Sequence, residues 1–129
     1  MGGNYFPYIW KNGCNHFIFW DKQTPIGMSF SDGELAWTSY SMAIRKYTYR
    51  NITGDKIHPT QKPIVLYDWI FSNYAEEGMR ILDTHLGSGS SRIAAHKAWL
   101  DFVGCELDKE YYDAQEKRYK QFTSQLRLL

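Results

Sequence analysis

The sequence has few of the residues that mark secreted, metal-binding or membrane proteins. Its two cysteines, Cys14 and Cys105, lie far apart and form no CxxC pair, so we expect free thiols rather than a disulfide framework. The four histidines have no metal-ligand spacing, which argues against a zinc site. No apolar run reaches the ~18 residues of a membrane span, and the amino terminus lacks a signal-peptide pattern. These absences predict a cytoplasmic protein with no membrane partner.

An excess of charge of one sign is also missing. The formal net charge is +1, so no strong overall field attracts the chain to nucleic acid or to an anionic membrane. A local excess lies between Arg45 and Lys56, where basic residues outnumber acids and tyrosines are interleaved. Such a run suits contacts with a phosphate backbone, and it is equally typical of a solvated loop.

The residues that are present predict a folded domain. Hydrophobic residues make up 43% of the 129 positions and charged residues 22%, which is the composition of a globular protein with one core. Aromatic residues reach 17% and are concentrated from Tyr5 to Tyr49. They either fill an aromatic core or hold rings out for stacking on bases or on a partner.

In the first half, short aromatic runs alternate with loops. Residues 16–21 and 35–40 predict strands, whereas residues 22–34 and 50–60 are rich in loop-forming residues. Pro63 predicts a helix start with Thr60 near its N-cap, and Gly78 predicts its end. Apolar residues recur between these limits at helical spacing, namely Ile64, Leu66, Tyr67, Ile70, Phe71 and Tyr74.

The second half alternates strands and helices. Residues 80–86 and 101–107 predict strands, and residues 90–99 and 109–125 predict helices. This order is typical of a βαβα unit with two parallel strands joined by a right-handed crossover, so the fold class is α/β. Cys105 lies within the second apolar run and is expected to be buried.

The first strand–helix junction, residues 83–91 (DTHLGSGSS), predicts a ligand site. Gly87 and Gly89 allow the backbone to pass close to a ligand, and the following helix start offers unpaired N–H groups. Glu106 and Asp108 follow the second strand, where such folds bind ribose hydroxyls. Arg92 replaces the third glycine of a dinucleotide loop, which favours a nucleoside cofactor with an amino-acid tail. A tight turn followed by a solvated acid is the alternative.

Three motifs in one order resemble those of bacterial DNA adenine-N6 and cytosine-N4 methyltransferases. Residues 83–91 resemble the D-P-F-x-G-S-G-T-T loop of that family, and residues 58–63 (HPTQKP) resemble its H-P-T-x-K-P signature. Residues 103–112 resemble its G-x-E-x-D…Y-Y segment. A signature that directly precedes the loop is typical of the permuted branch, in which the catalytic region comes first.

The resemblance implies a Rossmann-like fold that binds S-adenosylmethionine. It implies a single, partial methyltransferase domain over residues 1–129, with a target or DNA-side segment at 1–57 and a cofactor-binding segment at 58–129. His85 stands where the family has Phe, and its ring is expected to pack beside the cofactor. The implied cofactor-binding residues are Thr60, Lys62, Pro63, Asp83, His85, Gly87, Gly89 and Glu106.

The catalytic tetrapeptide of the family, Asp/Asn/Ser-Pro-Pro-aromatic, is not found in this sequence. The chain contains Pro7, Pro25, Pro59 and Pro63 and no Pro-Pro pair, so no catalytic residue is assigned. In the permuted order this motif belongs upstream of residue 1, and we expect a natural remnant or truncated product. Two hypotheses remain: a DNA methyltransferase whose activity survives, with or without a second polypeptide that supplies the catalytic strand, or a non-catalytic module that binds cofactor or DNA.

The resemblance also implies double-stranded DNA as a partner. Trp37 and Tyr40 are candidates for a base pocket, and Arg45, Lys46 and Arg50 for phosphate contacts. Because the absent part would carry central strands, we expect an exposed sheet edge that is covered by homo-oligomer formation or by a complementing catalytic fragment.

Overall fold

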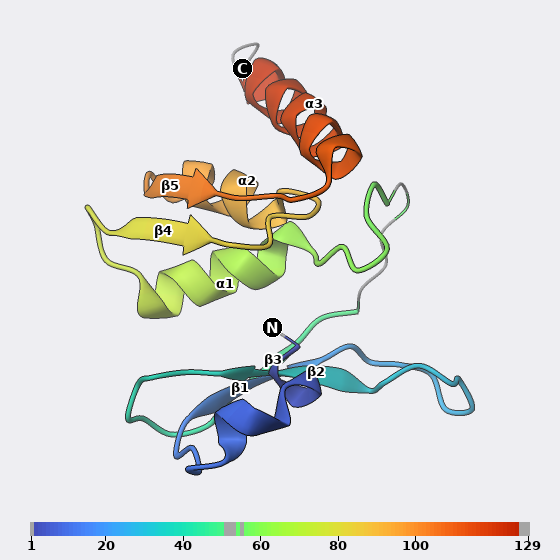
Figure 1. The fold of residues 1–129 in the computed structure, drawn as a ribbon, viewed down its shortest axis with the longest axis vertical. Helices are drawn as coiled ribbons and strands as arrows, with labels where there is room; N and C mark the ends of the chain where they lie inside the picture. Colours follow the sequence, from blue (N-terminus) through green and yellow to red (C-terminus); the bar gives the residue numbers. More distant parts are fainter. Residues whose placement is uncertain (1, 51–53, 55, 127–129) are drawn as a thin grey trace. The chain divides into compact units, whose positions relative to one another are not determined.

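The computed structural model describes residues 2–50, 54 and 56–126. The chain divides into two compact units, unit 1 (Met1–Ile52) and unit 2 (Thr53–Leu129), whose elements are labelled in Figure 1. Among the residues described, no helix has the length and apolar character needed to cross a membrane.

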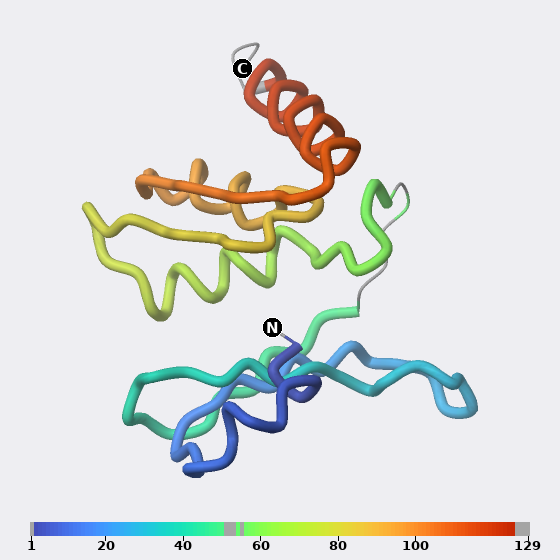
Figure 2. Tube along the Cα trace, in the orientation of Figure 1, coloured from blue at the N-terminus to red at the C-terminus, as the bar shows by residue number. Residues whose placement is uncertain are grey.

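Unit 1 is a small sheet preceded by two short 3-10 helices, η1 (Gly3–Tyr5) and η2 (Pro7–Trp10). Its strands are β1 (Phe17–Asp21), β2 (Gly33–Trp37) and β3 (Arg45–Thr48), in the order β2-β1-β3. β1 pairs with β2 in antiparallel and with β3 in parallel orientation. The long connection between β1 and β2, residues 22–32, extends away from the sheet, as Figure 2 shows.

The sequence correctly predicts β1 and places β2 two to three residues too late, but it misses β3. The segment from Arg45 to Thr48 resembles a solvated basic run because β3 exposes most of its side chains and buries little of the apolar surface that marks a strand. The core of unit 1 lies instead on the central strand β1, where Ile18 and Trp20 are buried. Trp20 Nε1 donates a hydrogen bond to the carbonyl oxygen of Tyr49 at 3.0 Å, which ties the end of β3 to this core.

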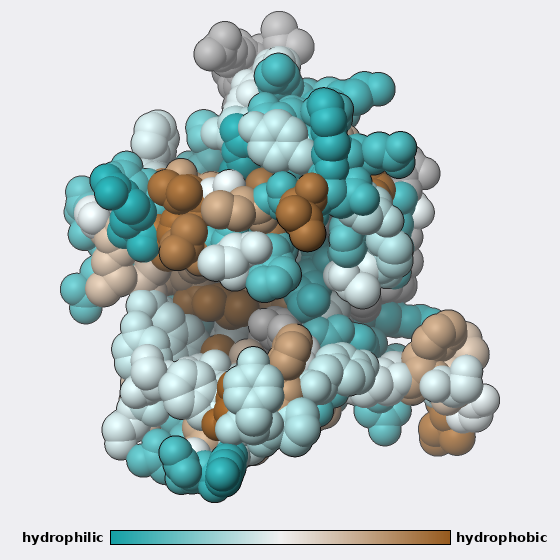
Figure 3. Space-filling view, in the orientation of Figure 1, coloured by the Kyte–Doolittle hydropathy of each residue, from teal (hydrophilic) through white to brown (hydrophobic). Residues whose placement is uncertain are grey.

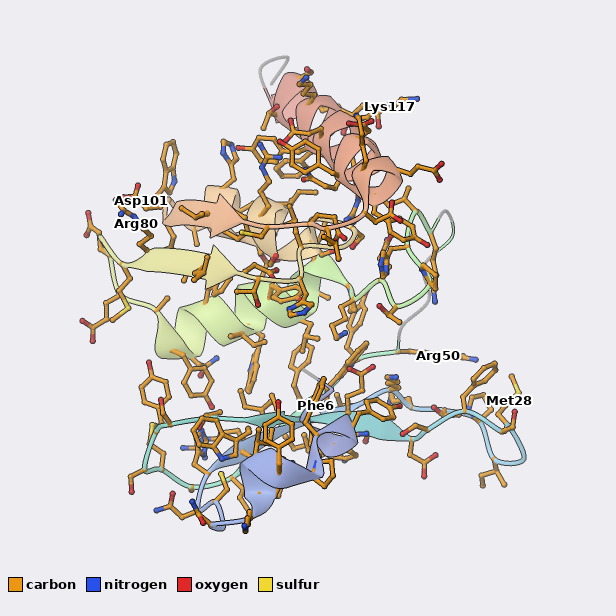
Figure 4. All side chains as sticks on the ribbon, in the orientation of Figure 1. Phe6, Met28, Arg50, Arg80, Asp101 and Lys117 are labelled. Atoms are coloured by element: carbon orange, nitrogen blue, oxygen red, sulfur yellow. The ribbon has the colours of Figure 1, made fainter. Side chains whose placement is uncertain are left out.

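Unit 2 contains the predicted alternation of helices and strands. Its elements are α1 (Ile64–Tyr74), β4 (Arg80–Asp83), α2 (Ser90–Lys97), β5 (Asp101–Gly104) and α3 (Lys109–Leu126). β4 and β5 pair in parallel, with Arg80 opposite Asp101 and Asp83 opposite Gly104. Figure 4 shows Arg80 and Asp101 side by side at the amino ends of these strands, where their side chains form an ion pair at 3.5 Å.

The predicted limits of the first helix of unit 2 need correction. Pro63 lies at the N-cap with an extended backbone, so the helix begins at Ile64 and Thr60 is not part of its cap. The helix ends at Tyr74 because Ala75 leaves the helical conformation, with its N–H bonded to the Phe71 carbonyl oxygen. Gly78 lies beyond this end, in the turn that leads into β4, where its φ of +82° suits glycine.

Both strands of unit 2 are shorter at their carboxyl ends than the apolar runs predict. Residues 84–86 and 105–107 leave the sheet and form loops, and Cys105 is exposed rather than buried. The alternation of strand side chains ends where these loops begin, so the apolar character of Leu107 does not mark a strand position. The loops at this edge carry half of the predicted cofactor-binding residues, namely His85, Gly87, Gly89 and Glu106.

One face of the β4–β5 sheet is covered by helices. Phe71 of α1 and the buried Ala94 and Ala95 of α2 pack with Ile81 and Phe102, which point to that face. Side chains of the opposite face, Leu82 and Val103, are 64% and 48% exposed. Figure 3 shows apolar surface over these strands.

Candidate functional site

The site is built on the turn from β4 into α2. Parallel strands present their carboxyl ends at one edge, where ligands of open α/β sheets bind. Gly87 and Gly89 have φ values of +53° and +72°, which other residues adopt only with strain. Gly89 is the N-cap of α2, so the first N–H groups of that helix open on this turn.

Asp83 at the end of β4 holds the turn at two points. Its Oδ1 accepts the backbone N–H of His85 at 3.0 Å, and its Oδ2 accepts the hydroxyl of Ser91 in the first turn of α2. Its carbonyl oxygen accepts the N–H of Cys105, which continues the pairing with β5. The carboxylate predicted to meet a cationic ligand therefore also shapes the loop.

Glu106 lies in the loop after β5 and reaches back to the glycine turn. Its Oε1 accepts the N–H of Asp108 at 3.0 Å and its Oε2 accepts the N–H of Gly87 at 2.8 Å. These bonds, first that from Asp108 and then that from Gly87, lower the pKa of Glu106 below its ordinary value. Each carboxylate oxygen has a second lone pair that can accept a hydroxyl from a ligand.

Asp108, which also follows the second strand, has a different role from Glu106. Its Oδ1 accepts the N–H groups of Glu110 and Tyr111 at 2.9 and 3.1 Å. Asp108 is thus the N-cap of α3, where a carboxylate satisfies unpaired donors of the helix start.

The HPTQKP segment contacts the glycine turn through His58. Carbon and nitrogen atoms of the His58 ring lie 3.6–3.7 Å from the position of a Cβ at Gly87, and the ring packs on Tyr111 with centroids 4.3 Å apart. His58 Nδ1 accepts the N–H of Thr60 at 3.2 Å and lies 3.1 Å from its hydroxyl. His58 was not among the predicted site residues, although it is the first residue of the HPTQKP signature. Nothing in the sequence indicates that its ring lies on the glycine turn.

The remaining predicted residues occupy different parts of this edge. The carbonyl oxygen of Lys62 accepts the Ser90 hydroxyl at 2.7 Å, and Pro63 is buried at the start of α1. His85 is exposed, and its Nδ1 lies 2.9 Å from the Thr84 hydroxyl. The structure therefore brings Lys62, Gly87, Gly89 and Glu106 into one bonded arrangement, whereas the packing of His85 on a ligand stays a prediction.

The five DNA candidates all lie on unit 1. Trp37 and Tyr40 line a groove of about 650 Å³, together with the uncharged residues Asn12, Gly13, Cys14, Asn15, Thr38, Ser39 and Ser41. Lys46 is ion-paired with Asp21 at 2.8 Å, and this contact is the main cause that lowers the pKa of Asp21. Arg45 and Arg50 are exposed, and Figure 4 shows Arg50 pointing away from the sheet.

Comparison with known sequences gives a consistent family. A family model described as DNA methylase, of the N6/N4 methyltransferase type, matches residues 8–117. The type II methyltransferase M2.DpnII of Streptococcus pneumoniae is 39% identical over 61 residues, which are 47% of this chain and 23% of that protein. The type II methyltransferase M.HinfI of Haemophilus influenzae is 28% identical over 116 residues, covering 88% of this chain and 32% of that protein. The chain thus spans a quarter to a third of these relatives.

Comparison with solved structures agrees on the fold. The crystal structure of the M1.HpyAVI–SAM complex superposes with a TM-score of 0.70 at 23% sequence identity, over 89% of this chain and 68% of that chain. A second crystal structure, of M1.HpyAVI, gives a TM-score of 0.59 at 21% identity, over 89% of this chain and 66% of that one. The α/β arrangement with a parallel βαβα unit is therefore a partial Rossmann-like methyltransferase fold, as the sequence predicted.

Proposed function

Because this chain belongs to the N6/N4 DNA methylase family, we propose that unit 2 binds S-adenosylmethionine at the glycine turn for methyl transfer to DNA. The acceptor is the exocyclic amine of adenine or cytosine, the two targets of the family type. A cytoplasmic location forms part of this proposal, since DNA is the substrate that it invokes.

The observation that carries the proposal is the geometry of Glu106. Its carboxylate lies in the loop that follows β5 and accepts the N–H of Gly87 at 2.8 Å, so the acid and the glycine turn are joined at one edge of the sheet. Free lone pairs on a carboxylate in this position suit the ribose hydroxyls of a nucleoside. The remaining acid of the turn, Asp83, suits a cationic amino-acid tail.

The residues of the turn fit an adenosyl sulfonium compound better than a phosphate ligand. Two acids, Asp83 and Glu106, accept N–H groups of the turn, and acids attract a cation and repel a phosphate. The guanidinium that also bonds to the turn, that of Arg118, donates to the Ser88 carbonyl oxygen and the Ser90 hydroxyl. When bound, S-adenosylmethionine supplies a methyl group on a positively charged sulfur. The chain's own contribution is to orient that compound through Glu106, the helix start at Gly89 and the His58 ring over Gly87.

Calorimetry with the demethylated product, S-adenosylhomocysteine, tests the site. We expect Glu106→Gln to weaken binding about tenfold or more, since an amide cannot accept both N–H groups and the ribose hydroxyls. Asp101→Asn is the matched control, because Asp101 is an exposed acid at the amino end of β5, the strand whose opposite end leads into the Glu106 loop. Equal affinity of wild type and Glu106→Gln, or no binding by wild type, would refute the proposed site.

We place the DNA contacts of the proposal on unit 1. β1 pairs with Trp37 through Phe17 and with Arg45 through Ile18, so both residues flank the same end of the central strand. Because successive side chains of a strand point to opposite faces, the register puts Trp37 on the Phe17 face and Arg45 on the Ile18 face. We therefore propose two separate contacts, a base on the Trp37 ring and a phosphate on Arg45. Arg45→Ala should weaken oligonucleotide binding and reduce its salt slope by about one. An unchanged slope would remove Arg45 from the interface.

A second candidate function is binding without transfer. It is favoured by one feature of the sequence, the lack of any Pro-Pro pair for the family's catalytic tetrapeptide. Incubation with tritiated S-adenosylmethionine and unmethylated DNA separates the two candidates. Label transferred to DNA supports the enzyme, and bound cofactor without transferred label supports the module.

Association of unit 2 with a further chain completes the proposal. Parallel sheets are normally covered on both faces, yet Leu82 and Val103 of the described sheet are exposed. A second copy of this chain or a complementing catalytic fragment would cover them. Light scattering after size exclusion should give a dimer mass at micromolar concentration, and a stable monomer would refute homo-oligomer formation.

A further inference from the structure

Helix α3 turns buried polar side chains toward the glycine turn. Gln115 is 1% exposed, and Arg118 is half-buried so that desolvation lowers the pKa of its guanidinium. Lys117, the residue before Arg118, is exposed and extends away from the helix in Figure 4. Polar side chains are costly to bury unless they are hydrogen-bonded, so the partners of Gln115 and Arg118 indicate what this face of α3 does.

Arg118 bonds to the turn itself. Its Nη1 donates to the carbonyl oxygen of Ser88 at 2.7 Å and to the hydroxyl of Ser90 at 2.9 Å. The N–H of Gly89, on the same peptide as the Ser88 carbonyl, donates to the Leu86 carbonyl oxygen at 2.9 Å. The Ser88–Gly89 peptide is therefore held at both its oxygen and its nitrogen.

The hydroxyl of Ser90 extends this contact to the HPTQKP segment. It donates its one proton to the Lys62 carbonyl oxygen at 2.7 Å, so it accepts from Arg118 and from the Ser88 hydroxyl at 3.2 Å. One buried hydroxyl thus joins α3, the glycine turn and residues 58–63. Gln115 closes the same side, because a Cβ at Gly89 would lie 3.1 Å from its Oε1.

We propose that Arg118 is a positioning residue that fixes the glycine turn and, through Ser90, aligns the turn with the HPTQKP segment. The turn then has its ligand-binding shape before any ligand arrives, which spares the cost of ordering it on binding. The consequence for cofactor affinity rests on the proposed function, whereas the fixing of the turn does not.

Arg92 provides a matched control. It also joins α2 to α3, through Gln115 Oε1 at 3.0 Å and an ion pair with Glu116, and it packs on the Tyr119 ring. Its loss removes a comparable charged contact between the same helices without touching the Ser88 carbonyl. Arg118→Met and Arg92→Met are therefore compared by amide hydrogen exchange of residues 86–91 in the ligand-free protein.

Arg118→Met should raise exchange at the Gly89 amide about tenfold or more over wild type, because it removes a charge-assisted bond from that peptide. Arg92→Met should leave exchange at the Gly89 amide within about twofold of wild type, even if this variant loses as much thermal stability as Arg118→Met. Arg118→Lys should give an intermediate rate, since one ammonium reaches only part of the same acceptors. Should Arg118→Met fail to fold, Arg118→Lys and Ser90→Ala decide by the same measurement.

Equal exchange in Arg118→Met and Arg92→Met overturns the proposal. Affinity for S-adenosylhomocysteine gives the second measurement, with about tenfold weaker binding expected for Arg118→Met and not for Arg92→Met. If wild type does not bind this compound while exchange rises only in Arg118→Met, the proposed function fails and the positioning of the turn stands. If wild type binds S-adenosylhomocysteine and neither variant changes amide exchange, the proposed function stands and the positioning of the turn by Arg118 fails.

Discussion

Replacing Gly89 by alanine tests how the glycine turn is held. Gly89 has φ +72°, and an added Cβ would lie 3.1 Å from Oε1 and 3.2 Å from Cβ of the buried Gln115. Adopting this backbone with an L side chain costs about 1–2 kcal/mol, and crowding a packed side chain costs about 1–3 kcal/mol more. We therefore expect Gly89→Ala to lower the free energy of unfolding by about 2–5 kcal/mol.

Gly78→Ala separates the backbone cost of an alanine at positive φ from the cost of crowding Gln115. Gly78 has φ +82° and nothing within 4 Å of an added Cβ, so its substitution carries the backbone cost alone, about 1–2 kcal/mol. Urea unfolding of both variants, followed by fluorescence, measures the difference. Equal losses of stability would show that α3 does not pack on the turn, and the reasoning about Gln115 and Arg118 would fail with it.

Three further predictions follow from the same contacts. The pKa of Glu106 is lowered, so its carboxylate stabilises the fold above the ordinary titration range of a glutamate and loses this effect as pH falls through its own pKa. The urea midpoints of wild type and Glu106→Gln should therefore differ at neutral pH and converge as the pH falls below that range. Lys46→Met should weaken oligonucleotide binding less than Arg45→Ala does, because Lys46 is already paired with Asp21. An equal loss of oligonucleotide affinity in the two variants, measured in a salt titration, contradicts this prediction. A fragment of residues 54–129 should fold and bind S-adenosylhomocysteine with an affinity within about threefold of that of the whole chain, because the contacts described for the site join residues of unit 2. Calorimetry that detects binding by the whole chain and none by the fragment refutes this prediction.

The sequence predicts unit 2 well because its signals are local. Short apolar runs that predict strands alternate with segments in which apolar residues recur at helical spacing. The two glycines of the turn mark the junction between strand and helix. The carboxyl limits of β4 and β5 are less predictable, because Leu86 and Leu107 are apolar without belonging to a strand. Strand β3 is hidden for the opposite reason, since it pairs through its backbone while its side chains are charged and exposed.

The contacts that shape the site could not be predicted from local pattern. Glu106 reaches a backbone N–H 19 positions earlier, and Arg118 reaches a carbonyl oxygen 30 positions earlier. Neither partner has a side chain that marks the contact, because both bonds are made to the main chain. A helix rich in charge, such as α3, resembles a solvated surface until its register against the turn is known.

The two acids of the turn show why position alone did not fix their roles. An isolated carboxylate after a strand predicts a ligand contact, yet Asp83 and Glu106 accept hydrogen bonds from the loops around them and, for Asp83, from the first turn of α2. Those hydrogen bonds occupy some of the acceptor positions of each carboxylate. They also restrain the backbone of the turn at glycines that would otherwise sample many conformations. In the proposed site, the oxygens left for a ligand would be fixed in direction, which would lower the entropy lost on binding and add directional selectivity to that of charge. A loss of affinity in either acid's variants thus combines a missing ligand contact with a displaced turn, and the ligand-free exchange of residues 86–91 distinguishes the two.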